Sequence, residues 1–322
     1  MISHSQIPIW PIDDGTLYYR TYAAIIQNFE KAFELAYPRS KILFIDNTYI
    51  NAQQVISIIH DNPCDVVAIF SLTDPAYAWH YIKEQLDLKF PDLIKFYIGN
   101  HSPDINIIFW FLVTYNERLT GLSNRVTPQN FKYIYLNYTA KPHPHRLRLL
   151  EQLKNQKLDS IGFNTVGQRQ VHTDPAETMS LGNLDIWNQH FLTIVGSTVF
   201  NIGDGNILIS EKESKPFIGM RPFVINGSPK NYQELERMGF DTFKDLWPVA
   251  ELSSEDDSLE ATQQKCHSVI CDVVRDLQTH DLARYYKKLF PRLEYNHYRF
   301  MEYCRDEVDR WCHQHITLPP RQ

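Results

Sequence analysis

The sequence predicts an α/β protein built from two domains, on three observations. The chain has 322 residues, which is more than one hydrophobic core usually serves. Short apolar runs alternate with segments whose apolar residues recur at helical spacing, a pattern typical of parallel sheets covered by helices. The composition, with 43% hydrophobic and 22% charged residues, is that of a globular protein.

The first half of the chain alternates strands and helices. We expect strands at 41–47, 65–71, 93–100 and 105–113, and helices at 21–37, 52–62 and 76–90. A polar stretch at 117–130 contains Gly, Ser and Pro without periodicity, so a domain boundary should fall there. The N-terminal domain is therefore assigned to residues 1–128.

The second half repeats this style and then becomes helical. Strands are expected at 131–138, 158–164, 190–198, 206–212 and 221–227, with helices at 146–156 and 231–238. Two long helices, 257–287 and 296–314, should be joined by a break at 290–296, because this stretch contains Pro291. These elements predict a second domain at 129–292 and a C-terminal helical segment at 293–322, with packing back onto the N-terminal domain as one option. Both domains should be Rossmann-like, facing each other across a cleft.

Charge and cysteines exclude several classes. A net charge of −6 argues against a protein that grips duplex DNA non-specifically. The five cysteines show no CxxC spacing, so a disulfide framework or structural zinc is not expected, and reduced thiols fit a cytoplasmic protein. The N-terminus does not look like a signal peptide, and the longest apolar run, 105–113, is too short to cross a membrane. Nucleotide-loop, zincin and serine hydrolase motifs are missing from the contexts that they require.

The stretch ILISEK at 207–212 carries the strongest functional signal. If it is a strand, Glu211 and Lys212 lie where the chain leaves the sheet, and a helix starting around Ser214 would point its N–H groups at the same place. The lysine could then hold a phosphate and the carboxylate a ribose hydroxyl. The competing interpretation is an exposed Glu-Lys pair on a turn.

This stretch also resembles a known motif. ILISEK, Gly219, the segment 221–225 and Gly227-Ser-Pro together are similar to the nucleotide-sugar motif of the α1,3-fucosyltransferase family. The wider block resembles predicted glycosyltransferases encoded by large phages. A second patch, YIYLNYTAKPHPHRLRLLEQL at 133–153, is similar to the strand, Asn-containing loop and Arg-led helix that precede this motif. The resemblance covers about residues 131–245 and is confined to motifs.

The resemblance implies a glycosyltransferase of the GT-B type. It would be inverting and independent of metal and cofactor, with a nucleotide-diphosphate sugar as donor. Arg146 and Lys212 would contact the diphosphate, and Glu211 the ribose or sugar. The nucleotide-sugar-binding residues implied by the match are Arg146, Ser197, Thr198, Glu211, Lys212, Lys215 and Gly227. One departure stands out, because Ser197 falls where the family has a carboxylate, so fucose is not assumed as the sugar.

The catalytic base should come from the N-terminal domain. Asp46, Asp74 and His101 follow strands there, and we favour Asp46 and then His101, although each could instead cap a loop. The acceptor could be a glycan or a hydroxymethylated base of phage DNA. The alternative function is a catalytically inactive GT-B-fold protein with a binding or structural role, which the replacement at Ser197 favours. His143 and His145 make only a weak metal motif.

Overall fold

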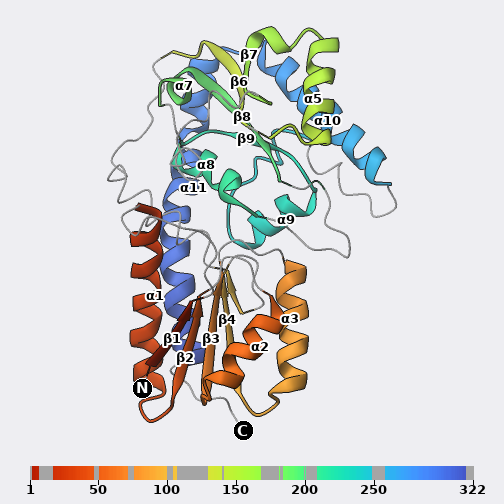
Figure 1. Cartoon of the computed structure of the whole chain (residues 1–322). Coiled ribbons are helices and arrows are strands. Elements are labelled where there is room, and N and C mark those ends of the chain that lie inside the picture. The colour runs from red at the N-terminus through yellow and green to blue at the C-terminus, as the bar shows by residue number, and fades with distance from the viewer. Residues whose placement is uncertain are drawn as a thin grey trace. The chain divides into compact units, whose positions relative to one another are not determined.

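A computed structural model describes most of the chain. The described residues are 2–6, 17–46, 51–71, 76–99, 104–106, 130–139, 141–167, 181, 184–198, 200, 209–248 and 258–316 (Figure 1). They form two compact units: unit 1 combines residues 1–119 with 303–322, and unit 2 comprises residues 120–302. The sequence assigned the corresponding divisions to 128 and 292. Both units contain a parallel sheet flanked by helices, which confirms the predicted α/β class.

Unit 1 is organised around a five-stranded parallel sheet in the order β1-β2-β3-β4-β5. Its strands are β1 (Ile2–Gln6), β2 (Ile42–Asp46), β3 (Val66–Ser71), β4 (Ile94–Gly99) and β5 (Ile105–Asn106). Its helices are α1 (Leu17–Ala36), α2 (Ala52–Asp61) and α3 (Ala76–Lys89). The central strand β3 is buried along its whole length, as expected for a parallel strand covered on both faces.

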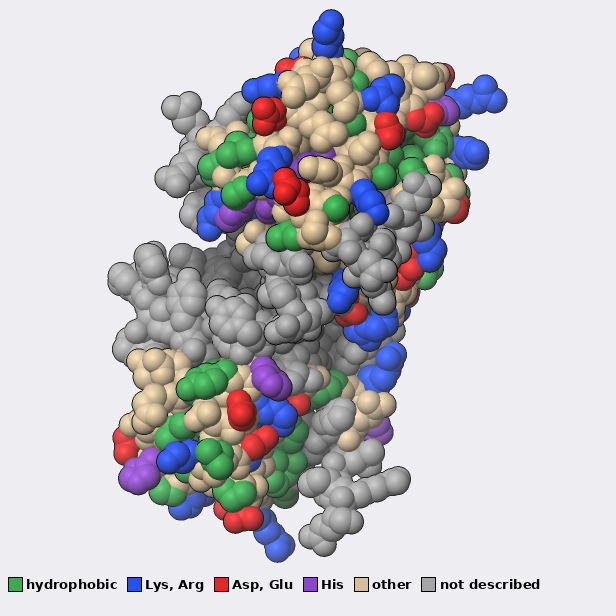
Figure 2. Space-filling view, turned by 90° about the vertical axis from the view of Figure 1, so that its right-hand side faces the viewer, with side chains coloured by type: hydrophobic (Ala, Val, Ile, Leu, Met, Phe, Trp, Pro, Cys, Tyr) green, Lys and Arg blue, Asp and Glu red, His purple; other side chains and the backbone are tan. Residues whose placement is uncertain are grey.

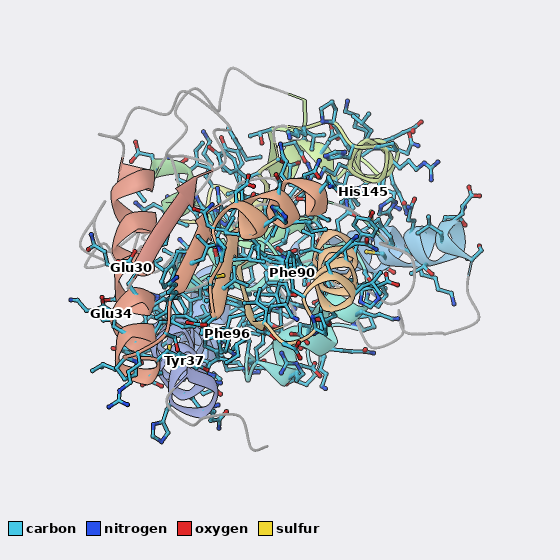
Figure 3. The ribbon with its side chains drawn as sticks, turned by 60° about the horizontal axis from the view of Figure 1, so that its bottom comes forward. Glu30, Glu34, Tyr37, Phe90, Phe96 and His145 are labelled. Atoms are coloured by element: carbon cyan, nitrogen blue, oxygen red, sulfur yellow. The ribbon has the colours of Figure 1, made fainter. Side chains whose placement is uncertain are left out.

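Alternate side chains of these strands enter two separate parts of the core. Leu43 and Val67 pack in the cluster that includes residues of α2 and α3. The neighbouring residue Phe44 points the other way and contacts Phe33 of α1 edge to face. Phe96 of β4 contacts Phe33 as well, and it lies near Tyr37 at the end of α1 (Figure 3).

Unit 2 contains a four-stranded parallel sheet in the order β7-β6-β8-β9. The strands are β6 (Tyr133–Asn137), β7 (Gly162–Asn164), β8 (His190–Gly196) and β9 (Phe223–Asn226). The chain goes from β6 outward to β7, then returns to pair β8 with the other side of β6. The strand order therefore reverses between β6 and β8. In open α/β sheets, ligands bind beyond the carboxyl ends of the strands at such a reversal.

Helices cover both faces of this second sheet. The helices of unit 2 are α5 (Pro144–Asn155), α7 (Leu184–Gln189), α8 (Glu211–Ile218), α9 (Lys230–Arg237), α10 (Leu259–Leu277) and most of α11 (Leu282–Trp311), with the 3-10 helix η1 (Asp159–Ile161). The last turns of α11 and the π-helix η4 (Cys312–Ile316) belong to unit 1. The helices α5 and α10 pack together (Figure 1). In β9, Asn226 bonds to His267 of α10, whereas Phe223, on the opposite face by strand alternation, packs against Phe217 of α8. Thus α5 and α10 cover one face and α8 the other.

A buried arginine ties the start of β8 to its surroundings. Arg221 is 1% exposed. It donates hydrogen bonds to the carbonyl oxygens of His190 and Gly219 and to the hydroxyl of Tyr286. This arginine, part of the motif at 221–225, therefore joins β8, the end of α8 and α11 from inside the fold.

Three element predictions are wrong in whole or in part. The strand expected at 158–164 begins only at Gly162, because residues 159–161 form the 3-10 helix η1. The strand expected at 206–212 is not present in its described part, because Ser210 caps a helix that already begins at Glu211. The break expected at 290–296 is also absent, since α11 continues through Pro291. The chain breaks earlier, where the Asp281 carboxylate accepts hydrogen bonds from the backbone N–H groups of Ala283 and Arg284 and so starts α11. Among the described residues, no helix has the length and apolar character needed to span a membrane.

Candidate functional site

The candidate site lies at the carboxyl edge of the unit 2 sheet, between the ends of β6 and β8. After β6 the described residues 138, 139 and 141–143 lead to α5, and Gly196 ends β8, followed directly by Ser197 and Thr198. Helix α5 has Pro144 in its first turn, where a missing N–H costs nothing, and His143 precedes it as N-cap. The loop and the helix start therefore bring their polar side chains to the point where the strand order reverses.

Arg146 fastens this edge from the α5 side. Its side chain is buried, and its Nη2 donates to the carbonyl oxygens of Gly196 and Ser197 at 2.8 and 2.7 Å. Its Nη1 donates to the carbonyl oxygen of Lys141 at 3.0 Å. Burial lowers the Arg146 pKa to about 10, partly offset by Glu211 and Glu213, so the guanidinium stays charged at neutral pH.

His145 supports the same strand end. Its Nε2 lies 3.0 Å from the Ser197 carbonyl oxygen, so this nitrogen must carry the proton and donate it. The His145 pKa is lowered to about 4, chiefly by burial; the bond to Ser197 opposes this shift, and the charges of Arg146 and His143 contribute to it. The imidazole is therefore neutral at pH 7. The Ser197 carbonyl accepts from both His145 and Arg146, which satisfies both of its lone pairs.

Glu213 holds the strand end from the α8 side. This carboxylate is fully buried, and its Oε1 accepts a hydrogen bond from the Ser197 hydroxyl at 2.9 Å. Its Oε2 accepts from the Ser210 backbone N–H at 2.9 Å and from the Ser210 hydroxyl at 2.7 Å, which completes a capping box. Asn231 of α9 donates to the Ser197 hydroxyl at 3.2 Å. Burial raises the Glu213 pKa, while these donors and Lys212 act in the opposite direction.

Lys212 and Glu211 form the first turn of α8 and are partly exposed. The Lys212 ammonium pairs with the Glu211 carboxylate and donates to the Thr198 hydroxyl at 3.1 Å. Burial raises the Glu211 pKa, but Lys212 and then Lys215 outweigh it, so the net shift is downward and the carboxylate is ionised at neutral pH. Lys212 thus links the start of α8 directly to the end of β8.

Positive charge is in excess at this edge. Lys215 lies over the ring of Tyr138, 5.3 Å from its centroid, and its charge acts on Glu211. Burial lowers the pKa of His143, and the cations Arg146, Lys141 and Lys212 all lower it further. These four basic side chains, Lys141, Arg146, Lys212 and Lys215, outweigh Glu211 and Glu213. An anion would therefore be favoured here.

Three buried polar atoms at this edge have no hydrogen-bond partner among the residues that the structure describes. They are Thr139 Oγ1, His143 Nε2 and Arg146 Nε. Thr139 and Arg146 are only 3% and 2% exposed, and both contact Gly196, where an added Cβ would lie 2.6 Å from Thr139 Cγ2 and 3.2 Å from Arg146 Nε. A threonine hydroxyl and an arginine N–H can each donate, as can a neutral histidine. Unpaired buried donors are costly, so their concentration within residues 139–146 is a feature to explain.

The residues expected from the sequence are only partly brought together. Arg146, Ser197, Thr198, Glu211, Lys212 and Lys215 lie around one edge of unit 2. Gly227 lies there too: an added Cβ would meet Ser197 Oγ at 2.3 Å, so glycine allows β8 and β9 to end close together. Asp46 ends β2, and its side chain lies outside the described residues, as do Asp74 and His101.

Sequence reasoning missed the residue at the centre of this arrangement, Glu213. The spacing of Ser210 and Glu213, S-x-x-E, is the signature of a capping box and could have revealed it. This signal also predicts a helix beginning at Glu211, which the strand-like run ILIS obscured. The contacts of Thr139 and Asn231, in contrast, depend on the meeting of strand ends and have no local signature.

Comparisons with known proteins give no family. No protein-family model, no curated protein and no solved structure matches the chain. Among the described residues, no group of three or more His, Cys, Asp or Glu side chains is placed to hold a metal ion. Charged side chains of both signs are interspersed on the face of the described surface shown in Figure 2.

Proposed function

We propose that the protein is a glycosyltransferase of the GT-B type, which moves a sugar from a nucleotide-diphosphate donor to an acceptor hydroxyl. The acceptor is a glycan or a modified DNA base. The reaction inverts the anomeric centre and needs no metal. The site at the carboxyl edge of the unit 2 sheet would hold the donor, and unit 1 would supply the base, Asp46 or His101.

One observation carries this proposal: unpaired buried donors lie beneath an excess of positive charge at the strand-order reversal. Thr139, His143 and Arg146 supply the donors. Lys212 supplies positive charge in the first turn of α8, where helix N–H groups favour an anion, and Lys215 supplies it in the last turn. A diphosphate matches both features, because it carries several acceptor oxygens and negative charge.

The proposed reaction requires the negative charge on the leaving diphosphate to be stabilised. When the glycosidic bond to the diphosphate breaks, negative charge develops on the departing phosphate oxygen. Lys212 is partly exposed and could meet this charge directly, whereas Arg146, held by three carbonyl oxygens, would act mainly through its positive field and its Nε–H. Glu211, ionised beside Lys212, could accept hydrogen bonds from ribose or sugar hydroxyls.

The test is binding and turnover with a defined set of ligands. Calorimetry and thermal shift would compare GDP, UDP, ADP and CMP on wild type, Lys212→Ala and, as an exposed control, Lys154→Ala. We expect one diphosphate to bind, with roughly 10–100-fold weaker binding in Lys212→Ala, as for loss of one charged hydrogen bond, and no change in Lys154→Ala. The matching nucleotide sugar should then be hydrolysed or transferred.

A second function follows if binding occurs without turnover. The Ser197 position lacks the carboxylate of the resembling family, which favours an inactive binding protein. Binding of a diphosphate with no hydrolysis or transfer of any corresponding nucleotide sugar would support that alternative. Failure of every nucleotide to bind would contradict both functions.

A further inference from the structure

Two buried polar side chains hold the end of β8 from opposite faces of the sheet. Arg146 reaches it from α5 and binds the carbonyl oxygens of Gly196 and Ser197. Glu213 reaches it from α8 and binds the Ser197 hydroxyl. The charge of Glu213 also acts on Arg146, since it is among the groups that oppose the lowering of the Arg146 pKa.

Unlike Arg146, Glu213 also fixes the start of helix α8, which carries several residues of the site. Both Ser210 donors, the backbone N–H and the hydroxyl, point to its Oε2. The Ser210 hydroxyl oxygen in turn accepts from the backbone N–H of Lys212 at 3.3 Å. One carboxylate thus sets the position of Ser197 on β8 and of the turn that contains Lys212.

The hydrogen bonds around Glu213 also occupy the Ser197 hydroxyl as both a donor and an acceptor. Its hydroxyl gives its proton to Glu213 and accepts from Asn231, so it is used within the protein. The next hydroxyl along the chain, that of Thr198, is half-buried and meets Lys212. Position 197, where the resembling family has a carboxylate, is a serine in this chain. The Glu213 carboxylate of helix α8 lies next to this serine instead.

We propose that Glu213 is the positioning residue of this site, which holds Thr198 and Lys212 together by joining the end of β8 to the first turn of α8. Its effect on a bound diphosphate rests on the proposed function, but its effect on the two segments does not. Glu213 itself would not contact the ligand, because it is fully buried and its hydrogen-bond partners among the described residues are Ser197, Ser210 and Asn231.

Hydrogen exchange of the full chain tests the positioning without any ligand. Glu213→Ala should speed exchange roughly tenfold or more in peptides covering both 191–198 and 209–218, since it removes buried hydrogen bonds from both segments. Glu213→Gln, which keeps an acceptor oxygen, should fall between wild type and Glu213→Ala. The peptide of α10, 259–277, should be unchanged. Faster exchange in 209–218 alone would reduce Glu213 to a helix cap, and equal changes everywhere would mean general destabilisation; either result overturns the proposal.

Nucleoside diphosphate binding tests the consequence for function. We expect Glu213→Ala to weaken binding about as much as Lys212→Ala, roughly tenfold or more, with substantial recovery in Glu213→Gln. Asn296→Ala, which removes the buried hydrogen bonds to Asp241 elsewhere in unit 2, serves as the destabilised control and should bind like wild type. Wild-type affinity in Glu213→Ala would overturn the proposal. If wild type binds no diphosphate, the proposed function fails, while the exchange experiment still decides the role of Glu213.

Discussion

The Ser197 hydroxyl and the Glu213 carboxylate meet at 2.9 Å, although 16 residues separate them in the chain. This bond joins the end of a strand to the first turn of the following helix. It also explains why α8 starts where it does: the same carboxylate caps the helix through Ser210. Local capping and long-range packing thus depend on one buried side chain.

Arg146 should be needed for stability as well as for binding. We predict that Arg146→Met lowers the free energy of unfolding by about 3–5 kcal/mol, because the carbonyl oxygens of Lys141 and Gly196 lose their Arg146 donor and that of Ser197 keeps only His145. Urea denaturation measures this. The control is Arg148→Met, whose exposed side chain bonds only to Gln263 among the described residues and should cost less than about 1 kcal/mol. Equal losses in the two variants would contradict the structural role of Arg146.

Acid should destabilise unit 2 through two buried histidines. Burial lowers the pKa values of His145 and His267 to about 4, below the ordinary value of 6.5. The unfolded chain therefore binds protons that the folded one does not, and the free energy of unfolding should fall as pH drops from 6.5 towards 4, by up to about 1.4 kcal/mol per histidine and pH unit. Denaturation at a series of pH values should show a shallower dependence in His145→Gln, whereas His60→Gln, at an exposed position of α2, should keep the wild-type slope.

Gly227 should tolerate no side chain. An added Cβ would lie 2.3 Å from Ser197 Oγ and 2.8 Å from Ser197 Cβ, so Gly227→Ala must push β8 and β9 apart. We predict a loss of about 1–3 kcal/mol in thermal or urea unfolding, with Ser228→Ala as the neighbouring control. Retention of wild-type stability would show that the two strand ends are further apart than described.

Pro291 should be a weak point of α11. The helix continues through it, so the ring displaces one backbone hydrogen bond and crowds the preceding turn. Because the residue is exposed, Pro291→Ala should raise stability, by as much as about 3 kcal/mol. A rise in the melting temperature, with little change in Lys288→Ala, would agree. A lower melting temperature would mean that the proline itself makes contacts that hold the helix.

The helices and strands that the sequence predicts correctly are those indicated by local patterns of apolar residues. Runs such as DVVAIFS are apolar throughout and became the buried strand β3, and the helical spacing of 76–90 became α3. Pro291 led to the wrong prediction of a helix break. Tertiary packing around Leu289 and Leu293, both buried, keeps α11 intact where helix propensity alone would end it. The true helix start at Asp281 was marked only by one capping side chain.

The candidate site was predictable in its charges but not in its connections. Lys212, Glu211 and Arg146 stood out because charged residues followed apolar runs. The Arg146 guanidinium binds the Gly196 carbonyl, 50 residues away in sequence, and Ser197 faces the buried Glu213, 16 residues away. Both contacts depend on how helices α5 and α8 pack against the end of β8. Periodicity and composition carry no information on such long-range contacts.

Trp311, in the last turn of α11, packs edge to face on Phe29 and Phe96 in the core of unit 1. The other two rings belong to the first third of the chain. During synthesis on the ribosome, the N-terminal strands and helices would therefore emerge long before the tryptophan that completes their core. Residues 120–302 can form all of unit 2 in that interval. We expect the first-made part of this protein to be the last to reach its final packing.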